Sequence, residues 1–143
     1  MRFDKGKFTI NTDKSELQFD VIQSYLAEES YWAKGRTEGQ TKRAIENSLC
    51  FGLYCADKQV GFARVVSDHS TFAYVGDVFV LPAFSGQGLG RWLMETIIAH
   101  PDLQSLRRWV LATRDAHKLY EQFGFTELRF PARWMEKAAP DAY

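Results

Sequence analysis

The sequence predicts an α/β domain with a mixed central sheet, in which antiparallel strands come first and one strand–helix–strand crossover follows. Three strand-like runs, 49–56, 59–67 and 71–80, are separated by short polar turns, as in an antiparallel meander. The third run leads into a glycine loop, an amphipathic helix that ends near His100, and a strand at 109–113, which the crossover rule makes parallel. With 143 residues, 45% of them hydrophobic, we expect residues 1–143 to form one domain around a single core.

The N-terminal part reads as a strand followed by two helices. Residues 8–11 alternate like a short strand, and residues 12–16 supply capping side chains before a helical run that reaches about Ala27. Residues 28–40 contain polar and glycine breakers, and helical spacing resumes over 41–48. A loop between two helices is therefore expected at 28–40.

The C-terminal part reads as a short helix and further strands. A helix is predicted over 116–122, Gly124 then leads to a strand-like run at 125–128, and residues 133–137 fit a last strand. The expected total is about six to seven strands, mostly antiparallel, with about four flanking helices.

Charge and composition exclude several classes of protein. Lys plus Arg (18) equals Asp plus Glu (18), so no long-range field attracts nucleic acid or anionic membrane. The apolar runs are too short to span a bilayer, and the N-terminus carries charges where a signal peptide needs apolar residues. We therefore expect a cytoplasmic protein with no nucleic-acid and no membrane partner. His69, His100 and His117 lack ligand-like neighbours, so no metal is expected.

The loop 85–90 (SGQGLG) is the strongest local signal of a binding site. It joins a strand end to a helix start, where unpaired backbone N–H groups and the helix dipole favour an anion. Glycines at alternate positions let the backbone approach a phosphate closely, and Gln87 and Arg91 could add donors. The loop therefore predicts a pyrophosphate site.

Three other interpretations of the glycines are to be weighed. A dinucleotide fold needs GxGxxG after an early strand, but Arg91 takes the last position here and three antiparallel strands precede the loop. A nucleoside triphosphate loop needs GxxxxGK followed by Ser or Thr, which the sequence lacks. Glycines that only make a tight turn remain an open alternative.

Two longer stretches carry a family resemblance. VFVLPAFSGQGLGRWLM (78–94) and DAHKLYEQFGF (115–125) together resemble the GNAT superfamily of acyl-CoA-dependent N-acyltransferases. The resemblance implies a GNAT-like fold with a splayed parallel strand pair, acetyl-CoA as co-substrate, no metal, and transfer of the acetyl group to a primary amine by direct attack in a ternary complex.

The resemblance also implies which residues bind the cofactor. The family loop motif falls on Ser85, Gly88 and Gly90, where Ser85 replaces the usual Gln or Arg. Binding of the pyrophosphate should then depend on backbone amides and Arg91, with the Ser85 hydroxyl as a shorter donor. The implied cofactor-binding residues are Val78, Phe79, Val80, Ser85, Gly86, Gln87, Gly88, Leu89, Gly90 and Arg91, with Thr113 where the family often has Asn.

Acetyl transfer needs an acid for the leaving thiolate, an oxyanion donor and a base. The resemblance places Tyr120 as the acid and the Val80 N–H as the oxyanion donor; a phenol with a pKa of about 10 keeps its proton at neutral pH. The alternative for Tyr120 is a core tyrosine beside Phe123 and Phe125. Asp77, which interrupts an apolar strand, is the candidate base, with a strand-end carboxylate bonded to backbone as its alternative.

The acceptor site has only general candidates. Tyr31 and Trp32 could cover an apolar part of the substrate, Arg64 could hold a carboxylate, and Arg36 is a further candidate without an assigned role. Packing of the aromatics on the sheet and an exposed Arg64 are the alternatives. We expect a small-molecule amine as acceptor; a protein or peptide acceptor, a non-catalytic acyl-CoA-binding module and a homodimer stay open.

Overall fold

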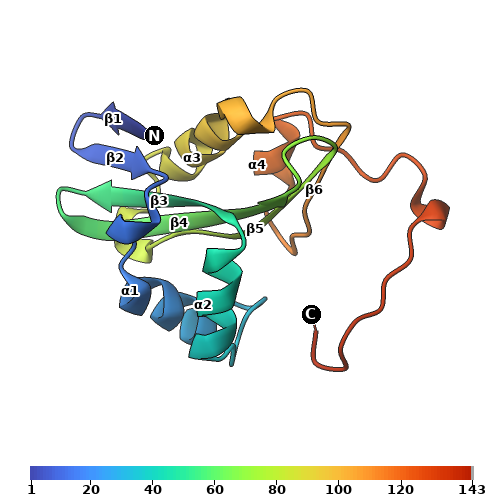
Figure 1. Ribbon diagram of the computed structural model, residues 1–143, viewed down its shortest axis with the longest axis horizontal. Helices are drawn as coiled ribbons and strands as arrows, with labels where there is room; N and C mark the ends of the chain where they lie inside the picture. The colour runs from blue at the N-terminus through green and yellow to red at the C-terminus, as the bar shows by residue number, and fades with distance from the viewer. Residues whose placement is uncertain (143) are drawn as a thin grey trace.

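A computed structural model describes residues 1–142 and contains one six-stranded sheet with its strands in chain order (Figure 1). All neighbouring strands pair antiparallel except the last two, which are parallel. This confirms the mixed sheet that the meander and the crossover predicted. The strands are β1 (Arg2–Lys5), β2 (Phe8–Asn11), β3 (Leu49–Cys55), β4 (Lys58–Ser67), β5 (Phe72–Val80) and β6 (Arg108–Val110).

Helices cover both faces of the sheet (Figure 1). On one face lie α1 (Phe19–Ser24), continued by a π-helical turn (Tyr25–Glu29), and α2 (Glu38–Glu46). On the other lie α3 (Leu89–Ile98) and α4 (His117–Glu121). Single 3₁₀ turns occur at Lys14–Glu16, Pro82–Phe84, Pro101–Leu103 and Pro131–Arg133.

Each face of the sheet has its own apolar cluster. Leu93, Met94 and Ile97 of α3 are fully buried against Phe51 and other residues of β2 to β5. On the opposite face Ile22 and Leu26 pack with Phe62 and Phe79 in a smaller cluster. Burying each such side chain contributes about 1.5–3 kcal/mol, so both helical layers are fixed to the sheet. Within residues 1–142, no helix is long and apolar enough to cross a membrane.

Several elements differ from the sequence prediction. The charged segment 2–5 pairs with β2 as a strand that the sequence did not indicate, and α2 begins at Glu38 instead of 41 because Thr37 and Gln40 form a capping box. The predicted strands at 125–128 and 133–137 are wrong: residues 125–142 contain no strand. The sheet still has six strands because β1 supplies the sixth.

The sheet opens between β5 and β6. Their parallel pairing is limited to three positions, Phe72–Tyr74 against Arg108–Val110, while β5 continues to Val80 without β6 beside it. The register of β4 and β5 also shifts between Phe62 and Arg64. Phe62 pairs with Phe79 and Arg64 with Gly76, so the extra residue of this bulge is on β5, where Asp77 has a left-handed backbone with φ of +52°. A bulge bends and twists the strand that carries it, so β5 diverges from β6 as the splayed pair requires.

Candidate active site

A cleft of about 520 Å³ lies where β5 and β6 diverge, and the loop after α1 closes one side of it. Its walls come from residues 74–80 of β5, residues 111–116 after β6, and residues 25–36. The cleft brings together the sequence candidates Tyr31, Trp32, Arg36, Arg64, Asp77, Val78, Phe79, Val80, Thr113 and Tyr120.

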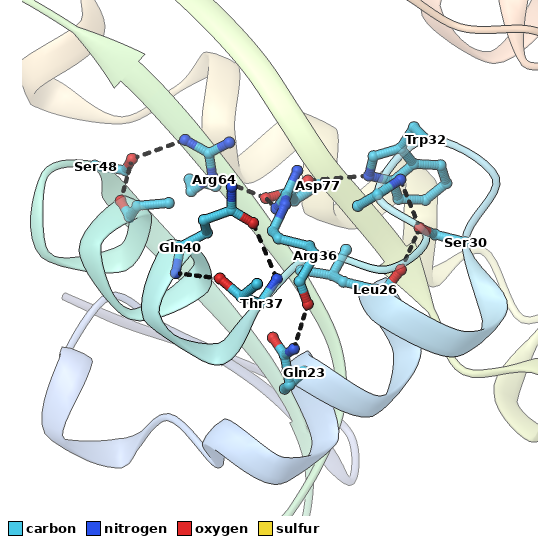
Figure 2. A network of polar contacts seen from close by, with 12 residues as sticks. Gln23, Leu26, Ser30, Trp32, Arg36, Thr37, Gln40, Ser48, Arg64 and Asp77 are labelled. Atoms are coloured by element: carbon cyan, nitrogen blue, oxygen red, sulfur yellow. Dashed lines mark hydrogen bonds and ion pairs between the residues drawn. The ribbon is translucent and has the colours of Figure 1, made fainter. Parts of the chain in front are cut away.

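Asp77 lies at the centre of a buried polar network on one side of the cleft (Figure 2). Its Oδ2 accepts hydrogen bonds from Arg36 (2.6 Å) and Arg64 (2.9 Å), and its Oδ1 accepts one from Trp32 Nε1 (2.9 Å). Arg64 also donates to the hydroxyl of Ser48 at 3.1 Å. We call Trp32, Arg36, Ser48, Arg64 and Asp77 the polar cluster. It carries two guanidinium charges and one carboxylate, so the cluster by itself has one net positive charge.

The contacts of Asp77 decide what it is suited to do. Burial raises the pKa of Asp77, but the hydrogen bond and charge of Arg36 and the charge of Arg64 outweigh burial and leave the pKa below its usual value. A carboxylate that accepts three hydrogen bonds and is 5% exposed is a weak proton acceptor. This geometry argues against the expected role of Asp77 as base and favours a role in holding the two arginines.

Tyr31 joins the two sides of the cleft. The backbone N–H of Arg114 donates to the Tyr31 hydroxyl at 2.8 Å, and the Arg114 guanidinium lies 4.0 Å from the centre of the Tyr31 ring. Trp32 meets the same ring edge-on at 5.1 Å. Cation–π and hydrogen-bond contacts of this kind stabilise a loop by a few kcal/mol at most. Tyr31 therefore bridges the cleft, a role that its position in the sequence did not indicate.

Tyr120 of α4 and Thr113, in the segment after β6, also line the cleft. Tyr120 is 9% exposed, its ring meets Phe125 edge-on at 6.0 Å, and it lines the cleft. It thus packs in the core, as the alternative interpretation predicts, and also lines the cleft, so its core packing does not conflict with the predicted role as acid. Thr113 Oγ1 accepts from the N–H of Ala116 at 3.0 Å, which fixes the turn that leads into α4 and to Tyr120.

The glycine loop presents backbone more than side chains. Gly86 and Gly88 have φ of +77° and +75°, which only glycine adopts readily. Gly88 is the N-cap of α3 and provides no capping side chain, so the first N–H groups of the helix remain for an anion. The Ser85 hydroxyl donates to the carbonyl of Pro82 at 2.8 Å, and this turns it back on its own loop.

Arg91 and Gln87, the expected helpers of the loop, are engaged with protein atoms. Arg91 Nε donates to Glu95 at 3.1 Å and its Nη1 donates to Gln122 at 2.7 Å. Gln87 Nε2 donates to the carbonyl of Phe84 at 3.5 Å. Arg91 thus links α3 to the end of α4.

Two lysines that the sequence analysis did not single out lie beside the glycine loop. The turn between β1 and β2 places Lys5 and Lys7 next to Gln87 and Gly88, around a hollow of about 340 Å³. Phe8 at this turn meets Phe84 edge-on at 6.2 Å, which fixes the turn against the loop. Gly6 between the two lysines indicated a turn in the sequence. Because β1 was not predicted, nothing indicated that this turn lies beside the glycine loop.

The cleft also contains carboxylates that the sequence did not single out. Glu29 and Asp115 line it together with Asp77. Glu29 ends the π-helical turn, a feature often found at functional sites. Burial, and then the charge of Glu29, raises the pKa of the nearby Tyr25. Glu29 lies two and three residues before Tyr31 and Trp32 in the sequence, so its closeness to these two candidates could have been predicted. Among residues 1–142, no group of three or more His, Cys, Asp or Glu side chains could hold a metal ion.

Comparisons with known proteins agree with this geometry. A family model described as an acetyltransferase (GNAT) domain matches residues 46–127. A Gibberella zeae protein named as an acetyltransferase is 32% identical over 138 aligned residues, which cover 81% of this chain and 77% of that protein.

Solved structures extend the likeness to the fold. A crystal structure from Xanthomonas campestris pv. campestris, assigned to the GNAT family, shares 48% identity with a TM-score of 0.92 over 94% of each chain. Rv2747 from Mycobacterium tuberculosis, solved in complex with CoA, shares 19% identity with a TM-score of 0.68 over 84% of this chain and 72% of that chain. At that identity the second likeness shows the fold alone.

Proposed function

The chain belongs to the GNAT family and is an acyltransferase, and we propose that it acetylates the primary amine of a small, carboxylate-bearing molecule with acetyl-CoA as donor. The observation that carries this proposal is the polar cluster, where Arg36 and Arg64 share one carboxylate beside the cleft. Glu29 and Asp115 balance the charge over the whole cleft wall, but the two arginines concentrate positive charge at the polar cluster, and a guanidinium suits a carboxylate in particular.

Acetyl-CoA is proposed to lie between the splayed strands with its pyrophosphate at the glycine loop. The GNAT fold generally binds acetyl-CoA, and the structurally similar Rv2747 was solved with CoA. Because the Ser85 hydroxyl is turned to Pro82, the phosphate contacts would come from backbone N–H groups of residues 86–91. Lys5 and Lys7 would add positive charge near the loop, where Ser85 takes the place of the longer Gln or Arg of the family pattern.

The direction of one backbone bond supports Val80 as the oxyanion donor. The N–H of Leu81 donates to Val60 on β4 at 2.8 Å. Successive N–H groups of a strand point to opposite sides, so the N–H of Val80 points to the open side, where β6 has diverged. A donor in that position would stabilise the oxyanion of the tetrahedral intermediate.

The proposed chemistry forms one C–N bond and breaks one C–S bond. The neutral amine attacks the thioester carbonyl, and its extra proton leaves to Glu29, directly or through water, because Glu29 lines the cleft. Tyr120 donates its proton to the departing thiolate and is reprotonated from solvent. Asp77 serves in this scheme as a positioning residue for Arg36 and Arg64.

A small acceptor suits the cleft better than a protein substrate. The Tyr31–Arg114 contact joins two segments of the cleft wall, residues 25–36 and 111–116, and a polypeptide that needs a wider cleft would have to break this contact. A peptide that outcompetes free carboxylated amines would contradict the proposal.

The test measures CoA thiol release with amines offered in pairs, each with its carboxylate and with the carboxylate replaced by an amide. We expect kcat/KM to be at least tenfold higher for the carboxylated member, about 1.4 kcal/mol, and this preference to vanish in Arg64→Leu. Equal rates within each pair would refute a carboxylated acceptor.

The role of Tyr120 is tested separately. Tyr120→Phe should lower kcat about a hundredfold with little change in KM; an unchanged kcat would remove Tyr120 from the mechanism.

A further inference from the structure

The helix that carries Tyr120 is held differently at its two ends. α4 has five residues, and the ring of Tyr120 near its end packs edge-on against Phe125 at 6.0 Å. At the start of the helix, the N-cap residue Ala116 provides no capping side chain. A helix this short is not stable by itself, because few hydrogen bonds offset the cost of its first turn. The position of its start therefore depends on the segment before it.

Residues 113–116 form that segment, and we call them the α4 turn. Thr113 Oγ1 accepts a hydrogen bond from the N–H of Ala116 at 3.0 Å, which closes the turn. The carbonyl of Ala116 in turn accepts the N–H of Tyr120 at 3.3 Å. Two successive hydrogen bonds thus connect the α4 turn to the backbone of Tyr120, and a shift of the turn would move this residue.

Tyr31 holds the α4 turn from another segment of the cleft wall. Its hydroxyl accepts the backbone N–H of Arg114 at 2.8 Å, across 83 residues of sequence. The Arg114 guanidinium lies 4.0 Å from the centre of the same ring. The ring contact restrains a side chain, whereas the hydrogen bond to the hydroxyl fixes the backbone of the turn itself.

Tyr31 can hold the turn because its own side of the cleft is anchored. Trp32 meets the Tyr31 ring edge-on at 5.1 Å, and Trp32 Nε1 donates to Asp77 at 2.9 Å (Figure 2). Asp77 is buried and is bonded to the two arginines of the polar cluster. A continuous set of contacts therefore extends from the polar cluster through Trp32 and Tyr31 to the α4 turn.

We propose that Tyr31 is a positioning residue for Tyr120: its hydroxyl fixes the α4 turn through the N–H of Arg114, and so fixes where the Tyr120 hydroxyl meets the departing thiolate. This inference rests on the proposed function, in which Tyr120 is the acid, and adds a residue to it. A general acid must lie within about 2.6–3.2 Å of the atom that it protonates, and a displacement of about 1 Å can lower a rate about a hundredfold.

This role differs from the sequence expectation that Tyr31 covers an apolar part of the substrate. A ring that covers the acceptor contributes to binding in the ground state, so its loss raises KM for the acceptor. A residue that places the acid contributes in the transition state, so its loss lowers kcat. Tyr31→Phe keeps the ring and removes the hydroxyl, and therefore separates the two roles.

The first experiment measures hydrogen exchange of the protein without substrate. In Tyr31→Phe, the amides of Arg114 and Tyr120 should both exchange at least about tenfold faster than in the native chain. Tyr54→Phe is the matched control, because its buried hydroxyl lies outside the cleft and has no hydrogen-bond partner within residues 1–142; it should leave both amides unchanged. Faster exchange at Arg114 with an unchanged Tyr120 amide would overturn the positioning role, and so would an unprotected Arg114 amide in the native chain.

The second experiment is a double-mutant cycle on kcat. Tyr31→Phe should lower kcat about tenfold in the native chain, with KM for the acceptor and for acetyl-CoA changed by less than about twofold. In the Tyr120→Phe background the same substitution should change kcat by less than about twofold, because there is no acid left to place. Circular dichroism checks that each variant folds.

Two kinetic outcomes would overturn the inference. Equal losses of kcat in both backgrounds would mean that Tyr31 acts independently of Tyr120, and a raised KM for the acceptor with native kcat would assign Tyr31 to the substrate. Hydrogen exchange uses no substrate, so it tests the hold on α4 even if the proposed acetyl transfer is refuted.

Discussion

The polar cluster and the glycine loop present their binding groups in opposite ways. In the polar cluster the groups are buried or partly buried side chains, brought from the segment between α1 and α2, the residue before β3, and strands β4 and β5. They are bonded to one another through Asp77 and Arg64. In the glycine loop they are backbone N–H groups at the surface, and the local side chains Ser85 and Arg91 are turned to other protein atoms. The comparison teaches that the proposed acceptor site depends on a set of residues that hold one another in place, whereas the proposed phosphate site depends on local backbone conformation.

Replacing Asp77, the centre of the polar cluster, should lower the free energy of unfolding more than any other change considered. Asp77→Ala leaves Arg36 and Arg64 partly buried without their shared carboxylate, which should lower the free energy of unfolding by about 3–5 kcal/mol. Asp77→Asn is the matched control, because it keeps an acceptor and tolerates the left-handed backbone; its loss should be smaller. Urea denaturation measures both. Equal, small losses would show that the cluster contributes little to stability.

The pH dependence of the unfolding free energy gives a second test of the polar cluster. The pKa of Asp77 is lower in the folded protein than its ordinary value near 3.9, so its stabilising contribution is present above that value and is lost as the pH falls through the folded pKa. The difference in unfolding free energy between the native chain and Asp77→Asn should be constant from pH 7 to about 5 and shrink below about 4. A difference that grows with acid would refute the assigned shift.

Substitutions in the glycine loop should lower the free energy of unfolding by less than substitutions in the polar cluster. Gly88→Ala adds a Cβ at φ of +75° and should cost about 1–2 kcal/mol. Gly90→Ala meets no atom within 4 Å and has no positive φ, so its stability should stay within about 1 kcal/mol of the native chain. Both added methyl groups would approach the proposed pyrophosphate site, so KM for acetyl-CoA should rise in both. An unchanged KM in both variants would separate the loop from the cofactor.

Removing the positive charge of Lys5 and Lys7 beside the glycine loop should have the smallest effect, and this effect should be on KM for acetyl-CoA. The double variant Lys5→Ala, Lys7→Ala should raise KM for acetyl-CoA about fivefold, roughly 1 kcal/mol, and make KM less sensitive to salt. Lys58→Ala, in the turn at the start of β4, is the control and should change neither. A double variant with native salt sensitivity would show that the two lysines do not contact the cofactor.

The sequence predicted best what is local. The meander, the glycine loop and α3 depend on alternation, turns and helix starts that lie within a few residues of each other, and all were found. Thr37 and Gln40 carried a readable capping box that would have placed the start of α2 correctly. The short, charged β1 was missed because only its pairing with β2 makes it a strand.

The polar cluster could not be predicted because it depends on tertiary structure. Asp77 meets Trp32, Arg36 and Arg64 across 45, 41 and 13 residues of sequence, and no spacing rule covers such distances. The wrong strands at 125–128 and 133–137 have another cause: their alternation is strand-like, but alternation alone does not make a segment pair, and residues 125–142 form no ladder with β6 although β6 pairs on one side only.

The left-handed backbone at Asp77 limits how this position can vary through evolution. Glycine and asparagine tolerate φ of +52°, but neither carries the charge that two arginines require, while glutamate carries the charge on a backbone less suited to that conformation. A lineage that abandons Asp77 must therefore also change Arg36 or Arg64. Positions 36, 64 and 77 should vary together among relatives, and the acceptor should change with them.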